Sequence, residues 1–200
     1  MSPTPHPKNE RTFLMVKPDG VKRGLTGEII KRLEQRNLKI VALEMFQATR
    51  EQIDGHYPKD ETWIRRVGGK TLSTYEKYGY DAKEELGTSD DLEIGKMVRE
   101  WLIAFMVSAP MVRMVVEGVH AVEMVRKLVG PTMPSAAEMG TIRGDYSVDS
   151  AASANKEHRA VHNLVHASET AEEAAHETEF WFGGEGRVFS YKRSEEEMQF

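Results

Sequence analysis

The chain has 200 residues, 40% of them hydrophobic and 30% charged, which is typical of a globular protein with a core of its own. A net charge of −5 without any run of lysine and arginine argues against broad nucleic-acid binding, and the lack of cysteine excludes disulfide bonds and thiolate metal sites. No apolar stretch approaches the ~20 residues of a membrane span, so we expect no membrane contact. The lack of cysteine is compatible with a reducing cytoplasm, where we expect the protein.

The first half of the chain alternates between strand and helix patterns. Residues 12–16 form an apolar run suited to a buried strand, which Pro18-Asp19-Gly20 ends with a turn, so that Lys17 lies at the strand end. Residues 1–10 are polar and rich in proline and are expected to be a flexible tail. An amphipathic helix, a second strand and a short helix are predicted next, at 26–37, 38–47 and 51–57.

Two later segments interrupt this regularity. Residues 58–96 lose periodicity and gain several glycines, which predicts an insertion, and the small, polar residues 147–158 predict a second one. Residues 183–200 are expected to be a C-terminal tail. The remaining pattern predicts a helix at 97–105, a strand at 111–117 and a helix at 122–129. A long loop at 132–146, a strand at 164–166 and a helix at 171–182 are predicted after them.

This order of elements predicts an α+β fold with the succession βαββαβ. The simplest architecture is one antiparallel four-stranded sheet covered by helices on one face, with surface insertions. We expect a single domain over residues 11–182, because no linker between domains is visible.

A histidine and a carboxylate near the C-terminus are predicted to meet. Thr170 and Glu173 have the spacing of a capping box that opens a helix. On that helix Glu177 shares a face with Trp181, so its carboxylate lies among buried groups and needs a partner. The nearest candidate is the imidazole of His166 at the end of the preceding strand. A histidine that is oriented through one nitrogen presents the other as a nucleophile or a base.

Two alternatives compete with a catalytic role for His166. The histidine and its carboxylate can be purely structural. Alternatively, His158, His162 and His166 are spaced i, i+4, i+8, so on one helix they would share a face and could bind a transition metal. The β-forming residues Leu164 and Val165 argue against such a helix.

Three cationic residues are candidates for binding an anion. Lys17 either ends a strand or projects from it towards an anion. Arg126 lies near the end of a helix, where it can also complement the helix dipole. Arg143, between Ile142 and Gly144 in the long loop, has no such ordinary explanation.

Three motifs in this order resemble the nucleoside diphosphate kinase family, over residues 11–182. They are Lys17-Pro18-Asp19-Gly20-Val21 with Arg23-Gly24, then Gly140-Thr141-Ile142-Arg143-Gly144-Asp145, then Asn163-Leu164-Val165-His166-Ala167-Ser168. The resemblance implies a ferredoxin-like fold and transfer of the γ-phosphate of a nucleoside triphosphate to a nucleoside diphosphate by a ping-pong mechanism. The insertions resemble those of longer, archaeal-type members.

The resemblance also implies a role for each matching residue. His166 would be the nucleophile that becomes phosphohistidine, Glu177 the carboxylate that orients it, and Ser168 the hydroxyl that supports this carboxylate. Lys17 and Asn163 would hold the sugar 3′-hydroxyl and the neighbouring phosphate. Mg²⁺ would arrive with the nucleotide phosphates, without metal ligands from the protein. The other matches are the phosphate clamp and a tyrosine near the histidine, namely Arg126, Thr132, Arg143 and Tyr57.

The chain departs from the family at several places. Ala167 and Glu169 stand where compact members have glycine and aspartate. The first insertion interrupts the region that stacks on the base, so the base shelf is Val98, Leu102 or Trp63.

The resemblance further implies a homo-oligomer, a hexamer or a tetramer. The alternative function is a non-catalytic nucleotide-binding regulatory or scaffold protein with the same fold. If the chain is a kinase, Arg143→Ala is expected to reduce turnover far more than stability.

Overall fold

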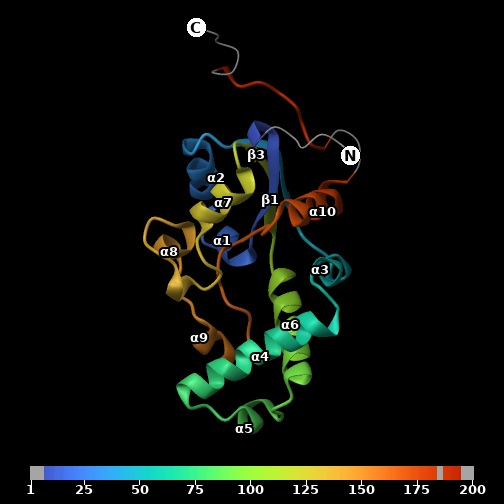
Figure 1. The fold of residues 1–200 in the computed structure, drawn as a ribbon, viewed down its shortest axis with the longest axis vertical. Helices are drawn as coiled ribbons and strands as arrows, with labels where there is room; N and C mark the ends of the chain where they lie inside the picture. Colours follow the sequence, from blue (N-terminus) through green and yellow to red (C-terminus); the bar gives the residue numbers. More distant parts are fainter. Residues whose placement is uncertain (1–6, 184–186, 195–200) are drawn as a thin grey trace.

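The computed structural model describes residues 7–183 and 187–194, which form one four-stranded sheet with its covering helices (Figure 1). The strands are β1 (Glu10–Val16), β2 (Lys39–Phe46), β3 (Met111–Gly118) and β4 (Val165–Ala167). The α-helices are α1 (Pro18–Lys22), α2 (Thr26–Gln35), α3 (Arg50–His56), α4 (Glu61–Tyr78), α5 (Ala82–Leu86), α6 (Asp91–Met106), α7 (Ala121–Val129), α8 (Ile142–Tyr146), α9 (Ala151–Lys156) and α10 (Ala171–Phe182). The 3-10 helices are η1 (Pro7–Asn9) and η2 (Pro134–Ala136).

The strands lie in the order β2-β3-β1-β4, and all neighbours are antiparallel. This topology confirms the predicted ferredoxin-like α+β sandwich. β1 lies between β3 and β4, and its residues 13–16 are completely buried. An uninterrupted apolar run of this kind is what a strand covered on both faces requires.

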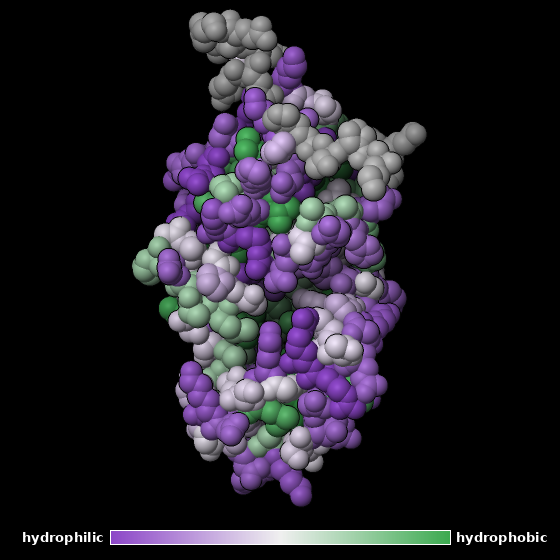
Figure 2. All heavy atoms as spheres, in the orientation of Figure 1, coloured by the Kyte–Doolittle hydropathy of each residue, from purple (hydrophilic) through white to green (hydrophobic). Residues whose placement is uncertain are grey.

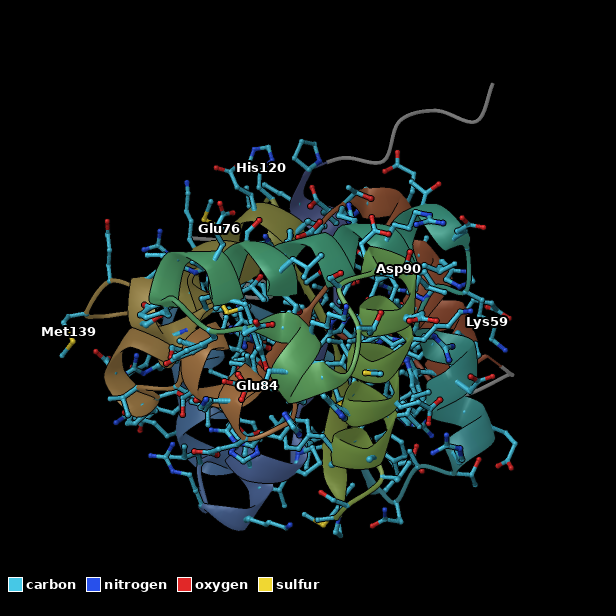
Figure 3. The ribbon with its side chains drawn as sticks, turned by 90° about the horizontal axis from the view of Figure 1, so that it is seen from below. Lys59, Glu76, Glu84, Asp90, His120 and Met139 are labelled. Atoms are coloured by element: carbon cyan, nitrogen blue, oxygen red, sulfur yellow. The ribbon has the colours of Figure 1, made fainter. Side chains whose placement is uncertain are left out.

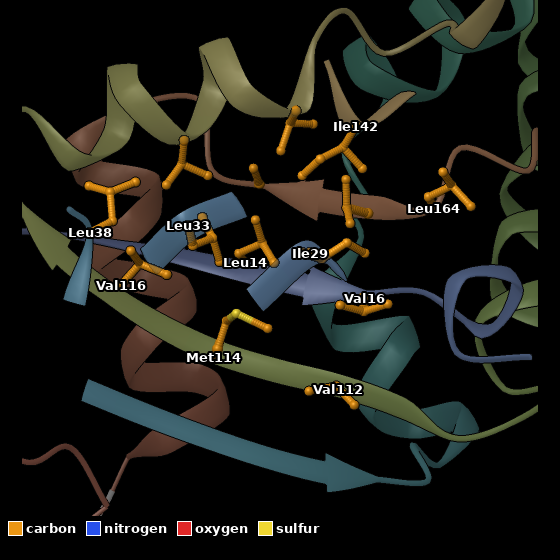
Figure 4. Close-up of a cluster of buried hydrophobic side chains, with 14 of the residues drawn as sticks. Leu14, Val16, Ile29, Leu33, Leu38, Val112, Met114, Val116, Ile142 and Leu164 are labelled. Atoms are coloured by element: carbon orange, nitrogen blue, oxygen red, sulfur yellow. The ribbon is translucent and has the colours of Figure 1, made fainter. Parts of the chain in front are cut away.

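Helices cover both faces of the sheet, so the predicted cover on one face was wrong. Leu14 and Val16 point into a cluster with residues of α2 and α7 (Figure 4). Phe13 and Met15 point the opposite way, into a second cluster with residues of α3, α6 and α10. Helical periodicity identifies the apolar stripe of each helix but does not say which side of the sheet the helix takes.

The first insertion is helical, although its glycines predicted an irregular excursion. α4 packs across α6, and a Cβ atom at Gly68 or Gly95 would collide with a main-chain carbonyl of the other helix (Figure 3). The glycines are therefore contact points between two helices and do not break them. The helices begin after the N-cap residues Asp60 and Asp90, and α4 ends before its C-cap residue Gly79, which has a left-handed backbone.

The segment predicted as a second insertion packs on the first. The hydroxyl of Tyr75 in α4 donates to the main-chain oxygen of Asn155 in α9 at 3.2 Å, and Lys156 forms an ion pair with Glu85 in α5. The two insertions therefore form one helical layer at the bottom of Figure 1. Figure 2 shows a recess between this layer and the sheet with its helices.

The C-terminal residues that are described run along the edge strand β2. The N–H of Phe189 donates to the carbonyl oxygen of Val41 at 2.8 Å, and the hydroxyl of Tyr191 donates to that of Ile40 at 3.0 Å. Of the tails predicted at 1–10 and 183–200, residues 1–6, 184–186 and 195–200 lie outside the described residues. No helix among the described residues is long and apolar enough to span a membrane.

Candidate active site

β4 presents His166 on the face of the sheet that α10 covers. His166 is paired with Met15 of β1, and directly opposite residues in an antiparallel pair point to the same face. α10 begins after Thr170, whose hydroxyl accepts the N–H of Glu173. In a complete capping box, the carboxylate of Glu173 would accept the N–H of Thr170. Here it accepts the N–H of Glu169 instead, so only the hydrogen bond to the hydroxyl of Thr170 forms as predicted.

Glu177 binds His166 and Ser168 with its two carboxylate oxygens. Nε2 of His166 lies 2.6 Å from Oε1, and the hydroxyl of Ser168 donates to Oε2 at 2.6 Å. Burial raises the pKa of Glu177, whereas burial, followed by the charge of Lys17, lowers the pKa of His166. The imidazole is therefore neutral near pH 7. It donates Nε2–H to the carboxylate, and its lone pair lies on Nδ1.

A second histidine, His56, completes this cluster and was not predicted as a site residue. Its Nδ1 lies 3.4 Å from Nε1 of Trp181 and 3.6 Å from Oε1 of Glu177, and its ring stands edge-on to His166 with 4.9 Å between centroids. The indole N–H can only donate, so Nδ1 of His56 is the acceptor. Burial, followed by the charge that His166 would carry, lowers the pKa of His56 to about 3. The buried indole of Trp181 signals that an acceptor is needed, but the sequence does not say which residue supplies it.

Lys17 and Asn163 lie side by side at the ends of neighbouring strands. Nζ of Lys17 donates to Oδ1 of Asn163 at 2.8 Å, and Nδ2 of Asn163 donates to the main-chain oxygen of Thr132 at 2.9 Å. Burial, followed by the charge of Arg143, lowers the pKa of Lys17 to about 8, against the opposing charge of Asp19. Since its hydrogen-bond partner is a neutral amide, the positive charge of the ammonium group is not neutralised by that partner and can attract an anion.

Arg143 is buried and held by three main-chain carbonyl oxygens. It donates from Nη1 to Gly130 at 2.8 Å, from Nε to Asn163 at 3.0 Å and from Nη2 to Val165 at 2.6 Å. Burial, followed by the charge of Arg126, lowers its pKa to about 10, so the guanidinium stays cationic at neutral pH. It therefore joins the end of α7 to the start of β4, a structural role that the sequence did not predict.

The cations predicted from the sequence act electrostatically on His166. The charges of Lys17, Arg143 and Arg126 all lower the pKa of His166, with Lys17 the strongest of the three. Arg126, in the last turn of α7, is partly exposed, and its Nη2 lies 3.4 Å from Oε1 of Glu169. The site therefore combines a neutral imidazole with a local positive field inside an acidic protein.

Tyr57 and Thr132 complete the predicted set. The ring of Tyr57 lies 5.1 Å from that of His56. Burial, followed by the charge of Glu177, raises the pKa of the phenol, which therefore stays protonated. Thr132 is exposed in the loop after α7, and its main-chain oxygen accepts the bond from Asn163 described above.

The family model described as nucleoside diphosphate kinase matches residues 10–63 and 92–186. The chain belongs to the nucleoside diphosphate kinase family. A nucleoside diphosphate kinase from Pyrobaculum aerophilum is 51% identical over 173 residues, which are 86% of this chain and 94% of that relative. One from Archaeoglobus fulgidus is 36% identical over 188 residues, or 94% of this chain and 95% of the relative.

Solved structures of the family share the fold. The crystal structure of an NDP kinase from Pyrobaculum aerophilum has a TM-score of 0.87 at 48% identity and covers 91% of this chain and 100% of its own. A kinase from Borrelia burgdorferi, solved as a transition state mimic with bound vanadate and ADP, has a TM-score of 0.72 at 33% identity over 93% and 94%. The chain is thus a phosphotransferase that moves the γ-phosphate of a nucleoside triphosphate to a nucleoside diphosphate, as predicted.

The match to the family model is interrupted between residues 63 and 92, where α4 and α5 lie. Of the candidates for a base shelf, Val98 packs against the insertion's own cluster around Tyr75. The ring of Trp63 lies 6.2 Å from that of Tyr57, and Leu102 is half-buried on α6. Val98 is therefore the least available of the three for a nucleotide base.

The three histidines spaced i, i+4, i+8 do not converge, so the alternative metal site was wrong. His158 stacks on Trp101 with 5.7 Å between centroids, and His162 stacks on Phe105 at 4.9 Å, whereas His166 pairs with its carboxylate. These residues are not on one helix, because β4 begins at residue 165. Within the described part of the chain, one group brings its potential metal-ligand atoms within 4.8 Å of one another, namely His56, His166 and Glu177.

Proposed function

We propose that His166 carries the phosphoryl group between the two nucleotides on Nδ1. The observation that supports this most is the 2.6 Å contact between Nε2 and Glu177, because it leaves the lone pair of Nδ1 as the nucleophile of the ring. The side chain of His166 is 22% exposed, compared with 6% for Glu177. The ring is therefore open to a substrate, whereas the carboxylate behind it is not.

The proposed reaction consists of two displacements at one phosphorus atom. The lone pair of Nδ1 forms a bond to the γ-phosphorus while the bond to the bridging oxygen breaks, and the nucleoside diphosphate leaves with that oxygen. A terminal phosphate oxygen of a second nucleoside diphosphate then attacks the same phosphorus, and the N–P bond breaks. Throughout, Glu177 stabilises the positive charge that develops on the imidazole, and Ser168 holds the carboxylate in place.

The remaining site residues position the phosphates and the sugar in this proposal. Charge in the transition state is spread over the equatorial oxygens, so Lys17, Arg126 and Arg143 stabilise it electrostatically. The bonded pair of Lys17 and Asn163 is suited to the sugar 3′-hydroxyl and the phosphate next to it. Thr132 adds a hydroxyl at the entrance. Tyr57 contributes a protonated phenol beside the histidine cluster.

The residues at the entrance fit a magnesium ion that arrives with the nucleotide. Glu169 is exposed and lies 3.4 Å from Arg126 in the proposed clamp, and carboxylate oxygens are ligands that Mg²⁺ accepts readily. We propose that the nucleotide phosphates carry the ion, as expected from the sequence, and that Glu169 also contributes a carboxylate to it, which the sequence analysis did not predict. Bound there, Mg²⁺ supplies positive charge to the phosphates.

Labelling with radioactive ATP and Mg²⁺ tests the proposed function. We expect acid-labile, alkali-stable label on the protein, its complete loss in His166→Ala, and its discharge by GDP. His176→Ala is the matched control, because His176 is an exposed histidine on α10, and it should be labelled normally. Bound nucleotide without covalent label would instead support the non-catalytic scaffold protein.

We also propose that the chain forms a homo-oligomer. Leu43 and Met45, on the edge strand β2, have 51% and 62% of their surface exposed, and a second copy of the chain packed on this strand would cover them. Sedimentation analysis distinguishes the predicted hexamer or tetramer from a single chain. A cytoplasmic location stays a prediction, which cell fractionation tests.

A further inference from the structure

Leu164, two residues before His166, has a backbone conformation that non-glycine residues rarely adopt. Its φ is +68°, in the left-handed region, and its side chain is completely buried. The N–H of Val165 donates to the carbonyl oxygen of Asn163 at 2.8 Å, which closes a three-residue γ-turn around Leu164. A strained turn persists only when the surrounding structure holds it.

The segment that follows β1 binds both polar main-chain groups of Leu164. The N–H of Lys17 donates to the carbonyl oxygen of Leu164 at 2.8 Å. The N–H of Leu164 donates to Oδ2 of Asp19 at 3.0 Å. A bond from an amide to a carboxylate is stronger than one between neutral groups. The turn is therefore tied to residues almost 150 positions earlier in the chain.

Gly20 allows this segment to lie directly against the turn. A Cβ atom at position 20 would lie 3.0 Å from the carbonyl oxygen of Leu164 and 2.8 Å from Cγ1 of Val16. Gly20 lies within α1 and has no positive φ, so close approach is what requires glycine here. Asp19 and Gly20 of the Lys-Pro-Asp-Gly motif thus both contribute to the contact with Leu164.

We infer that Asp19 is a positioning residue for phosphoryl transfer, because it holds the turn that sets the direction of the His166 imidazole. The inference rests on the proposed function of His166. Without the acceptor on Asp19, the N–H of Leu164 would lose its partner, and the turn could relax towards an ordinary φ. A shift of about 1 Å at a reacting group can lower a rate by about 10²-fold.

Asp19 could also act through its charge alone. Its Oδ1 is buried without a hydrogen-bond partner in the described part of the chain, and its charge opposes the lowering of the pKa of Lys17 and Arg143. Two substitutions separate these roles. Asp19→Asn keeps an oxygen acceptor and loses the charge, whereas Asp19→Glu keeps the charge and moves the acceptor by one methylene group.

The experiment compares both variants with Asp90→Ala. Asp90 accepts the N–H groups of Leu92 and Glu93 at the start of α6, so it controls for the loss of a carboxylate that binds the backbone outside the site. Four quantities are measured in each protein. They are the single-turnover rate of phosphohistidine formation at saturating ATP, the Kd for ADP, the melting temperature and the ring ¹⁵N resonances of His166.

Asp19→Glu should lower the rate by about 10- to 100-fold with little change in Kd, and it should shift the His166 resonances. Asp19→Asn should stay within about 3-fold of the native rate, and Asp90→Ala should lower only the melting temperature. A slow Asp19→Asn with a normal Asp19→Glu would overturn the inference in favour of a role for charge. Equal rates in all proteins would leave Asp19 with a structural role only. If the native chain forms no phosphohistidine, the proposed function of His166 is refuted. If it does, but the His166 resonances are unchanged in Asp19→Glu, only the positioning role of Asp19 is refuted.

Discussion

Nε2 of His166 and Oε1 of Glu177 lie 2.6 Å apart, and this contact leaves Nδ1 as the nitrogen that would face a substrate in the proposed reaction. The two residues are 11 positions apart, on β4 and on α10, which follows it directly. The contact is therefore formed between consecutive elements. It places a buried carboxylate behind a partly exposed ring, which is the arrangement that the proposed nucleophile needs in order to stay oriented.

Replacing Glu177 by glutamine should reduce activity without reducing stability. The amide keeps the shape but loses the charge that stabilises the imidazole during transfer, so the rate of phosphohistidine formation should fall by about 10- to 100-fold. Burial raises the pKa of Glu177, which means that the folded protein disfavours its charged form, so a neutral side chain carries no added penalty. Single-turnover kinetics and urea unfolding measure the two effects. Glu179→Gln, an exposed residue of α10, is the control, and an unfolding free energy that falls with the rate would contradict this account.

The sequence predicted the parts of this site that depend on local pattern. The helical face of α10, the cap at Thr170 and the strand with His166 follow from residue spacing within about 20 positions. The pairing of Glu177 with His166 could be derived in the same way, because both ends lie on neighbouring elements. The roles of Lys17 and Arg143 came from the family resemblance, since a lone lysine or arginine specifies no partner.

What the sequence did not predict depends on contacts between distant segments. His56 reaches the cluster from α3, and the acceptors of Arg143 lie directly after α7 and around the start of β4. Gly68 and Gly95 are recognisable as a helix crossing only when α4 and α6 are placed together, which is why the insertion looked irregular. The face of the sheet that each helix covers likewise depends on tertiary packing, which the sequence pattern does not specify.

The two arginines of the proposed clamp should respond differently to removal. Arg143→Ala removes the cation that donates three hydrogen bonds to main-chain carbonyl oxygens, so it should lower the free energy of unfolding by about 3 kcal/mol or more as well as the rate. This replaces the expectation from sequence that turnover would be affected far more than stability. Arg126→Ala removes a partly exposed side chain with one weak ion pair, and should change stability by less than about 1 kcal/mol. Urea unfolding and ADP binding separate the two, and equal stability of both variants would count against the structural role of Arg143.

Nucleotide binding should weaken as the pH rises through about 8. In the free protein, burial and the charge of Arg143 lower the pKa of Lys17 to about 8, so the cation that binds phosphate is lost above that pH. The Kd for ADP should then rise by up to about 10-fold per pH unit. The unfolded chain holds this proton up to about pH 10.5, so the contribution of Lys17 to folding stability should increase between pH 8 and that value. Calorimetric titration of ADP measures the first effect, and Lys17→Gln should abolish the pH dependence. A dependence that persists in Lys17→Gln would assign it to another group.

Asp149 should link the second insertion to nucleotide affinity. Its carboxylate accepts bonds from Arg159 at 2.6 and 3.1 Å and from the N–H of His162 at 2.7 Å, so it anchors the loop that leads into Asn163. Asp149→Ala should lower the free energy of unfolding by about 2–4 kcal/mol. It should also raise the Kd for ADP by about 10-fold, since Asn163 positions Lys17.

Glu157→Ala is the matched control for Asp149. Glu157 also pairs with Arg159, at 2.5 Å, but its side chain is 59% exposed, so its loss should cost less than about 1 kcal/mol and leave ADP binding unchanged. Urea unfolding together with ADP titration on both variants provides the comparison. If Asp149→Ala were destabilised but bound ADP with native affinity, the insertion would stabilise the fold without shaping the site. The proposed coupling between the insertion and ADP binding would then be refuted, because the hydrogen bond that the N–H of His162 donates to Asp149 is the contact that carries it.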